Sequence, residues 1–213
     1  MGSRIGERVF VEIGVGDGLE CNTIALMSRG WRGAWISGQP ISFTPASGGR
    51  LVFHETFLTL ENLLPVFSAA IGEVGEHLPA LVSVDIDGND FYVCEALLAA
   101  GVAPAVWVVE YNAAFPSDAQ WVMPYQPDFV WDGSDFYGVA ISSLARLFAG
   151  YGYFPVACSA QGANVFFVSE QHRDLFLDVP SDLDVLYQPP TYQLRHRWGH
   201  PTSPHTIAHI TEG

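Results

Sequence analysis

The sequence contains no lysine, so all nine of its basic residues are arginine. The missing amine excludes a Schiff-base or pyridoxal enzyme, a Walker-type lysine on phosphates and a lysine general base. Against the nine arginines stand 23 acidic residues, and the formal net charge is −14. Such a chain repels phosphate backbones and anionic surfaces, so we expect neither nucleic acid nor a membrane as its partner.

Cysteine is scarce as well, since Cys21, Cys94 and Cys158 lie far apart and form no C-x-x-C motif. A disulfide framework is therefore not expected, and a reducing cytoplasm is the predicted location. No apolar run reaches the ~18 residues of a membrane span, and the polar start "MGSRIGER" lacks the pattern of a signal peptide. With 49% hydrophobic residues, the sequence predicts a single domain over 1–213 with a sizeable core.

Apolar runs typical of strands alternate with helical segments along the chain. The predicted strands cover 7–13, 33–37, 50–55, 81–86, 105–111, 153–158 and 164–169, and the predicted helices cover 19–29, 59–74, 90–100 and 137–152. Apolar strands separated by helices indicate a parallel sheet that is buried on both faces. The last two strands are close enough in sequence to pair as a hairpin. The expected fold class is therefore α/β, with a mostly parallel seven-stranded sheet closed by an antiparallel hairpin and helices on both faces.

Two segments are predicted to be irregular. Residues 111–137 form a long insertion with eight aromatic residues and several aspartates, and residues 170–213 form a tail rich in proline and histidine. Structureless segments of this length in a compact domain are usually lids or binding loops.

A glycine-rich turn follows the first strand. In "EIGVGDG", Glu12 precedes three glycines at strict alternation, whereas a dinucleotide fingerprint would need a glycine where Leu19 stands. The acid followed by alternating glycines is the first motif of S-adenosylmethionine (SAM) methyltransferases, in which glycines let the backbone approach a bulky donor. A dinucleotide site and a tight turn without a ligand are the alternatives. The predicted donor-binding residues are Glu12, Gly14, Gly16, Asp17, Gly18, Asn22, Thr23, Ser37, Gly38 and Asp85.

The end of the second strand departs from the usual pattern of SAM enzymes, which carry an acid there to hold the ribose. Here the strand ends in "AWISGQ", so Ser37, Gly38 or Gln39 must hold the ribose hydroxyls. A hydrogen bond from a neutral group is weaker than one to a carboxylate. Glu61 or Asn62 is an alternative contact for the adenosine, and a plain helix start is the other interpretation of those two residues.

Two further strands end in concentrated polar residues, "SVDIDGNDF" and "VVEYNAAF". Ligands of open α/β sheets lie outside the carboxyl ends of the strands, and clustered carboxylates repel one another unless they are protonated or bridged by a cation. An all-oxygen set suits Mg²⁺ or Ca²⁺. By analogy with metal-dependent O-methyltransferases, the predicted metal ligands are Asp85, Glu110 and Asn112. Asp87 is the first candidate for general base and His200 the second; the alternative is that "DIDGND" only caps a helix.

Taken together, these motifs resemble small bacterial SAM-dependent methyltransferases related to the FkbM type. The resemblance spans almost the whole chain and rests on "VEIGVGDGLECNT", "GWRGAWISG", "VSVDIDGND", "VEYNAAFP", "FVWDGSDFYGVAISSLARLF", "GANVFFV", "YQPPTY" and "GHPTSPHTI". It implies a Rossmann-like SAM methyltransferase fold and methyl transfer to a saccharide hydroxyl. Within the group, the chain is similar to the mycobacterial sugar 1-O-methyltransferases of methylmannose polysaccharide synthesis.

The aromatic insertion fits a saccharide acceptor, because rings with carboxylates beside them suit a ligand with CH-rich faces and many hydroxyls. The predicted substrate-binding residues are Tyr111, Trp131, Asp132, Ser134, Asp135 and Tyr137. The alternative is that the rings pack the insertion onto the core.

Five of the seven histidines fall within the last 42 residues, but their spacing fits no zinc finger. The tail is instead expected to pack over the ligand mouth or a partner subunit, which favours a homodimer. Two rival functions stay open: an NAD-dependent oxidoreductase, and a non-catalytic saccharide-binding module on a methyltransferase fold.

Overall fold

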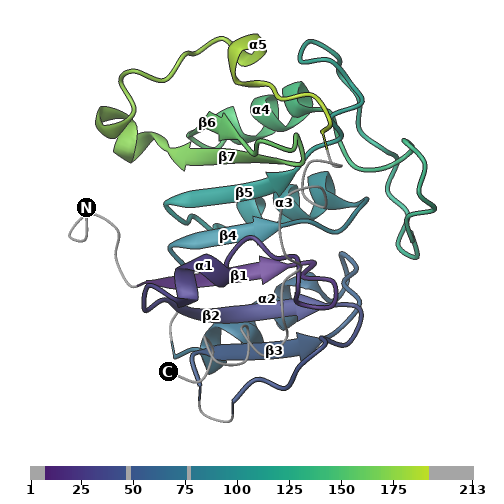
Figure 1. Ribbon diagram of the computed structural model, residues 1–213, viewed down its shortest axis with the longest axis vertical. Coiled ribbons are helices and arrows are strands. Elements are labelled where there is room, and N and C mark those ends of the chain that lie inside the picture. Colours follow the sequence, from purple (N-terminus) through teal and green to yellow (C-terminus); the bar gives the residue numbers. More distant parts are fainter. Residues whose placement is uncertain (1–7, 47–48, 76–77, 192–213) are drawn as a thin grey trace.

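The computed structural model describes residues 8–46, 49–75 and 78–191. Within them, seven strands form one sheet in the order β3-β2-β1-β4-β5-β7-β6 (Figure 1). The strands are β1 (Val9–Ile13), β2 (Arg32–Ser37), β3 (Leu51–Glu55), β4 (Leu81–Val84), β5 (Val106–Glu110), β6 (Tyr153–Cys158) and β7 (Asn164–Ser169). The first five are parallel, and β7 runs antiparallel to both β5 and β6. The predicted fold class is confirmed.

Helices cover both faces of the sheet. They are α1 (Ile24–Met27), α2 (Leu63–Glu73), α3 (Asp90–Ala99), α4 (Ile141–Ala149), the 3-10 helix η1 (Glu170–Leu175) and α5 (Leu183–Leu186). The larger part of the core joins α2, α3 and α4 to one face. On the other face, Met27 of α1 packs against Phe10 and Trp35, and Figure 1 shows α1 on the opposite side of the sheet from α2 and α3. The alternation of side chains along β1 therefore buries both of its faces.

The predicted helix over 19–29 is wrong, because only Ile24–Met27 is helical. The backbone N–H groups of Asn22 and Thr23, which would lie inside that helix, donate to the side chain of Glu12. The glycine turn therefore extends further along the chain than the apolar pattern suggests. The strand bounds agree with the prediction to within two residues.

The insertion lies beside the carboxyl ends of β4 and β5 (Figure 1). An isolated antiparallel bridge joins Val122, inside the insertion, to Val139, just after it. The side-chain amide of Asn112 donates to the carbonyl oxygens of Asp135 and Tyr137, at 2.8 and 2.9 Å. These contacts fold the insertion back onto the sheet. Among the described residues, no helix combines the length and the apolar character that crossing a bilayer requires.

Candidate functional site

The glycine turn owes its shape to three left-handed residues, since Gly14, Gly16 and Gly18 all have positive φ angles. Gly14 is the most constrained, because a Cβ atom at this position would lie 1.6 Å from the carbonyl oxygen of Asp85. No other residue type fits there without moving β4. The turn that follows β1 is thus pressed directly against the polar end of β4.

Glu12 fixes the far end of the turn. Its buried carboxylate accepts hydrogen bonds from the backbone N–H groups of Asn22 and Thr23 and from the Thr23 hydroxyl. The Thr23 hydroxyl in turn accepts from the indole N–H of Trp35, at 2.9 Å. Burial raises the pKa of Glu12 to about 6, although these hydrogen bonds lower it. Glu12 therefore supports the loop from beneath.

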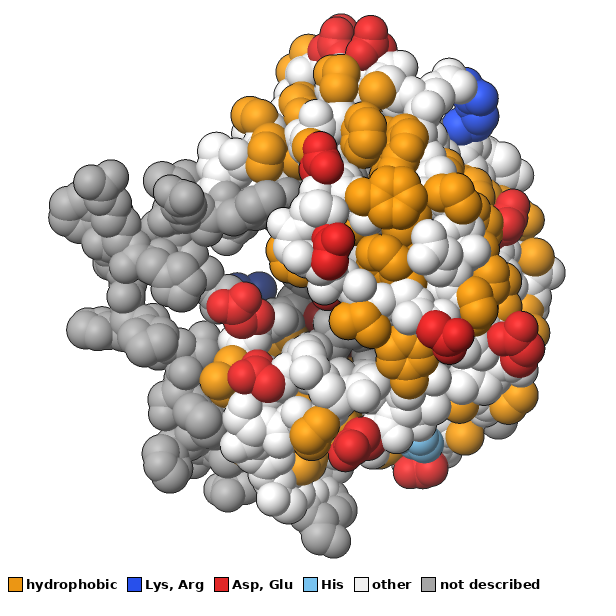
Figure 2. Space-filling model, turned by 90° about the vertical axis from the view of Figure 1, so that its right-hand side faces the viewer, with side chains coloured by type: hydrophobic (Ala, Val, Ile, Leu, Met, Phe, Trp, Pro, Cys, Tyr) orange, Lys and Arg blue, Asp and Glu red, His pale blue; other side chains and the backbone are white. Residues whose placement is uncertain are grey.

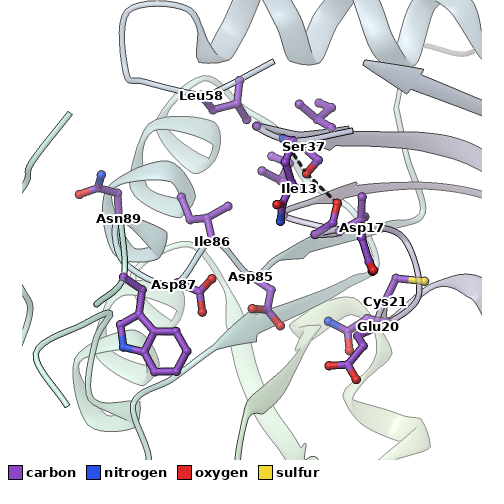
Figure 3. A pocket seen from close by; sticks show the side chains of 18 of the residues that line it. Ile13, Asp17, Glu20, Cys21, Ser37, Leu58, Asp85, Ile86, Asp87 and Asn89 are labelled. Carbon is purple, nitrogen blue, oxygen red and sulfur yellow. Dashed lines mark hydrogen bonds between the residues drawn. The ribbon is translucent and has the colours of Figure 1, made fainter. Parts of the chain in front are cut away.

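A cleft of about 1300 Å³ opens at the carboxyl ends of β1, β2 and β4. Seven of the predicted donor-binding residues line it: Gly14, Gly16, Asp17, Asn22, Ser37, Gly38 and Asp85. Glu12, Gly18 and Thr23 are not among the lining residues and shape the turn behind it. Figure 3 shows Asp85 and Asp87 as neighbours in the cleft, with Glu20 and Cys21 on the side of the glycine turn.

The end of β2 contributes neutral groups to the cleft. The Ser37 hydroxyl donates to the Gly16 carbonyl oxygen at 3.1 Å and is largely buried, so it ties the turn to β2. Gln39 lines the cleft beside it. Asn62 instead closes a local turn, accepting from the Thr59 N–H and donating to the Phe57 carbonyl oxygen. Asn62 is not among the lining residues, which favours the plain helix-start interpretation.

Asp85, Asp87 and Glu110 form an acidic cluster, in which one carboxylate oxygen of each lies within 4.8 Å of the others. Glu110 is buried, Asp85 is half-buried and Asp87 is exposed. Burial, together with the neighbouring carboxylates, raises the pKa of Asp85 and raises that of Glu110 well above its usual range. Burial also raises the pKa of Asp87. A cluster of this kind needs protons or a cation to offset its repulsion.

The backbone around Asp87 presents its side chain to the cleft. Asp87 has a φ of 60°, and its N–H donates to the Glu110 carboxylate at 3.1 Å. The neighbouring Asp90 is fully buried and accepts from the N–H groups of Ile86 and Gly88. Asp90 is the first residue of α3, and its carboxylate holds the preceding turn and does not cap the helix. Asp85 and Asp87 line the cleft.

Asn112 does not lie where the sequence analysis placed it, and a different asparagine contacts the acidic cluster. Both side-chain groups of Asn112 bond to backbone within the insertion, because its Oδ1 also accepts from the Ala114 N–H. Asn164, which the sequence interpretation overlooked, lines the cleft and donates to the Asp85 carboxylate at 3.3 Å. The signal was weak, since Asn164 reaches the cluster only through the pairing of β7 with β5.

The tip of the insertion forms one wall of the cleft through Phe129, Val130 and Trp131. The Phe129 ring packs against Gly88, where a Cβ atom would lie 2.4 Å from it. Val130 and Trp131 are exposed, at 75% and 46%. Figure 2 shows many apolar side chains, with acidic ones among them, on the side of the molecule to which the insertion belongs.

The other predicted substrate-binding residues lie in different positions relative to the cleft. Asp132 accepts from the Ser134 N–H, and the Ser134 carbonyl oxygen accepts from the Trp131 indole, so these residues hold the tip in shape. Asp135 is exposed and is not among the lining residues. Tyr111 and Tyr137 are buried and are not among the lining residues. Tyr111 belongs to the main core, and the Tyr137 ring lies 5.7 Å from that of Trp131, centroid to centroid. His200 lies outside the described residues.

No protein-family model matches the chain, and no curated protein matches it either. One solved structure that it resembles is the crystal structure of the antibiotic-resistance methyltransferase Kmr, with 15% sequence identity and a TM-score of 0.39. The match covers 78% of this chain and 89% of that one. The fold assignment rests on the strand order, and the FkbM-type subgroup stays a prediction.

Proposed function

We propose that this protein transfers the methyl group of SAM to a hydroxyl of a saccharide. The observation that carries the proposal is the contact between Gly14 and the Asp85 carbonyl, which brings the glycine turn into one cleft with Asp85 and Asp87 of the acidic cluster. A donor seated on the turn would have its positive sulfonium close to carboxylates, an arrangement that favours the cation.

The same turn argues against a dinucleotide. In dinucleotide sites, the pyrophosphate binds the free N–H groups at the start of the first helix. Here Glu12 already accepts from the N–H groups of Asn22 and Thr23, immediately before α1. A pyrophosphate would also meet the carboxylates of Asp17 and Glu20, which line the cleft. The charge of the turn therefore suits a cationic donor better than an anionic one.

The proposed reaction is an in-line displacement. The acceptor oxygen attacks the methyl carbon, the C–O bond forms as the C–S bond breaks, and the sulfonium leaves as a neutral thioether. Asp87 is the candidate base for the hydroxyl proton, because it is the exposed member of the cluster and its raised pKa lies closer to neutrality. Holding donor and acceptor in one cleft supplies much of the rate.

A divalent cation is part of the proposal, because the carboxylate oxygens of Asp85 and Glu110 are ligands that hard cations prefer, which leaves Asp87 to act as the base. Bound there, Mg²⁺ would lower the pKa of the acceptor hydroxyl. The wall formed by Phe129 and Trp131 supports a saccharide acceptor, since rings pack against the CH-rich faces of sugars while Asp87 meets a hydroxyl.

Donor identity is tested by calorimetric titration with S-adenosylhomocysteine and, separately, with NAD⁺. We expect binding of the first only; binding of NAD⁺ alone would refute the proposal. Labelled-methyl transfer to a panel of neutral saccharides, with and without EDTA, tests the activity. Tight donor binding without transfer to any acceptor would favour the non-catalytic module.

A further inference from the structure

Asn164 combines burial with an unsatisfied oxygen. It begins β7, lies directly opposite Glu110 in the antiparallel pair and is 6% exposed. Its Nδ2 donates to Asp85 Oδ2 at 3.3 Å, yet its Oδ1 is buried and has no hydrogen-bond partner among the described residues. Leaving a buried acceptor unpaired costs about 1–3 kcal/mol. Because Oδ1 has no bond to lose, only the contacts of Nδ2 hold the amide in its present orientation.

The amide stands where a cation ligand would be useful. Asp85 and Glu110 flank it, and both belong to the acidic cluster with Asp87. Three carboxylates bring more negative charge than one divalent cation neutralises, so a further ligand is best neutral. Asn112 does not meet this need, because its amide bonds to the backbone of the insertion.

We propose that Asn164 supplies a neutral oxygen ligand to a divalent cation bound by Asp85 and Glu110, beside the candidate base Asp87. This inference rests on the proposed function and deepens it. Rotating the amide by about 180° exchanges its nitrogen and oxygen. The nitrogen would then take the place of the unpaired Oδ1, and the oxygen would lie near the present Nδ2 position, 3.3 Å from Asp85 Oδ2. Adjacent ligands of octahedral Mg²⁺, bound at about 2.1 Å, are about 3 Å apart. The ligand is therefore within reach without any movement of β7.

The same amide contacts the glycine turn. Asn164 Nδ2 lies 3.5 Å from Asn22 Oδ1, and Asn22 Nδ2 donates to the Ser83 hydroxyl at 3.1 Å. A cation that turns the amide would release Asn22 Oδ1, which lies beside the proposed donor. Cation binding and donor binding are therefore expected to influence each other.

The test is titration of the whole protein with Mn²⁺ near neutral pH, followed by calorimetry and by electron paramagnetic resonance of the bound ion. We expect one Mn²⁺ per wild-type chain. Asn164→Leu removes the oxygen and should weaken binding about tenfold or more. Asn164→Asp keeps an oxygen and adds charge, so it should bind Mn²⁺ at least as tightly as the wild type. Gln161→Ala is the matched control, because it lines the cleft on the same hairpin and should leave Mn²⁺ affinity unchanged.

The Asn164→Asp variant distinguishes a residue that ligates the cation from one that only positions Asp85. If Asn164 only positions Asp85 by donating to it, both variants lose affinity, because aspartate cannot donate; that result overturns the inference. A wild-type protein that binds S-adenosylhomocysteine but no Mn²⁺ also overturns it and leaves the proposed function standing. Failure to bind S-adenosylhomocysteine refutes the proposed function instead. Melting curves check that each variant folds, and Asn164→Ala replaces the leucine variant if that one does not.

Discussion

The side-chain amide of Asn89 pairs with the backbone of Gln126 in both directions, donating to its carbonyl oxygen at 2.7 Å and accepting from its N–H at 3.2 Å. Asn89 stands at the N-cap of α3 but makes no capping bond with its side chain. It instead holds the insertion across 37 positions of sequence. The wall formed by Phe129 and Trp131 is thus attached to the turn that carries Asp87.

Asn89→Ala should loosen this wall. Losing two hydrogen bonds costs about 1–2 kcal/mol of unfolding free energy, and the KM for the acceptor should rise while the affinity for S-adenosylhomocysteine stays near that of the wild type. Steady-state kinetics and calorimetry measure the two quantities. An unchanged acceptor KM would show that the wall does not contact the acceptor.

Gly14→Ala should abolish donor binding, because the new methyl group would overlap the Asp85 carbonyl oxygen. The φ of 90° and the overlap together should cost at least ~3 kcal/mol of stability. Gly30→Ala is the matched control: its φ of 82° is similar, but its Cβ would meet no atom within 4 Å. It should lose only about 1 kcal/mol and keep donor affinity. Equal effects in chemical denaturation and in titration would contradict the prediction.

Asp87→Asn should reduce turnover by about 10²–10⁴-fold, since it removes the candidate base. The fold should survive, because asparagine tolerates the left-handed φ of 60° found here. Single-turnover transfer of a labelled methyl group gives the rate, and S-adenosylhomocysteine binding checks the cleft. Asp118→Asn, an exposed change elsewhere in the insertion, should leave the rate unchanged. Full activity of Asp87→Asn would remove Asp87 from the mechanism.

Stability should fall as the pH rises when no divalent cation is present. The folded-state pKa values of Asp85 and Glu110 lie above their unfolded values, and that of Glu12 rises from 4.5 to about 6. The folded state therefore binds more protons than the unfolded one above about pH 4, and the free energy of unfolding decreases through this range. Melting temperatures in EDTA should drop between about pH 5 and pH 8.

Addition of Mn²⁺ should reduce the fall in melting temperature between about pH 5 and pH 8. The bound cation offsets the repulsion between carboxylates that protons relieve at low pH. The measurement is the difference in melting temperature with and without the ion at each pH, which should grow as the pH rises. A constant difference would mean that the ion binds away from the cluster.

Sequence reasoning was most successful where the signal is local. The alternating glycines and the acids after β4 are read directly from the chain, and in the structure Gly14 and Asp85 meet. The prediction failed where a side chain forms hydrogen bonds with backbone N–H groups of a predicted helix. Glu12 takes the N–H groups of Asn22 and Thr23, and so the helix predicted over 19–29 shrinks to a single turn.

The prediction also failed where contacts between distant parts of the chain determine which residues reach the site. Asn164 has nothing in its neighbourhood of sequence that indicates a polar site, and only its register with Glu110 brings it to the cluster. The aromatic residues of the insertion look alike in sequence, yet Trp131 lines the cleft while Tyr111 and Tyr137 are buried. Whether a ring is buried or lines the cleft depends on how the insertion folds back onto the sheet.

The reversed direction of β7 has a consequence for biosynthesis. Its first residue, Asn164, reaches the cleft only after β7 has paired with β5, so a nascent chain that has emerged only as far as α4 would carry the glycine turn and the carboxylates but not the amide between them. Such long-range pairing is slow compared with local folding. The complete set of ligands would therefore exist only after the last hairpin has paired with β5. A chain stalled on the ribosome before β7 would lack Asn164 and would not bind the ion as the finished protein does.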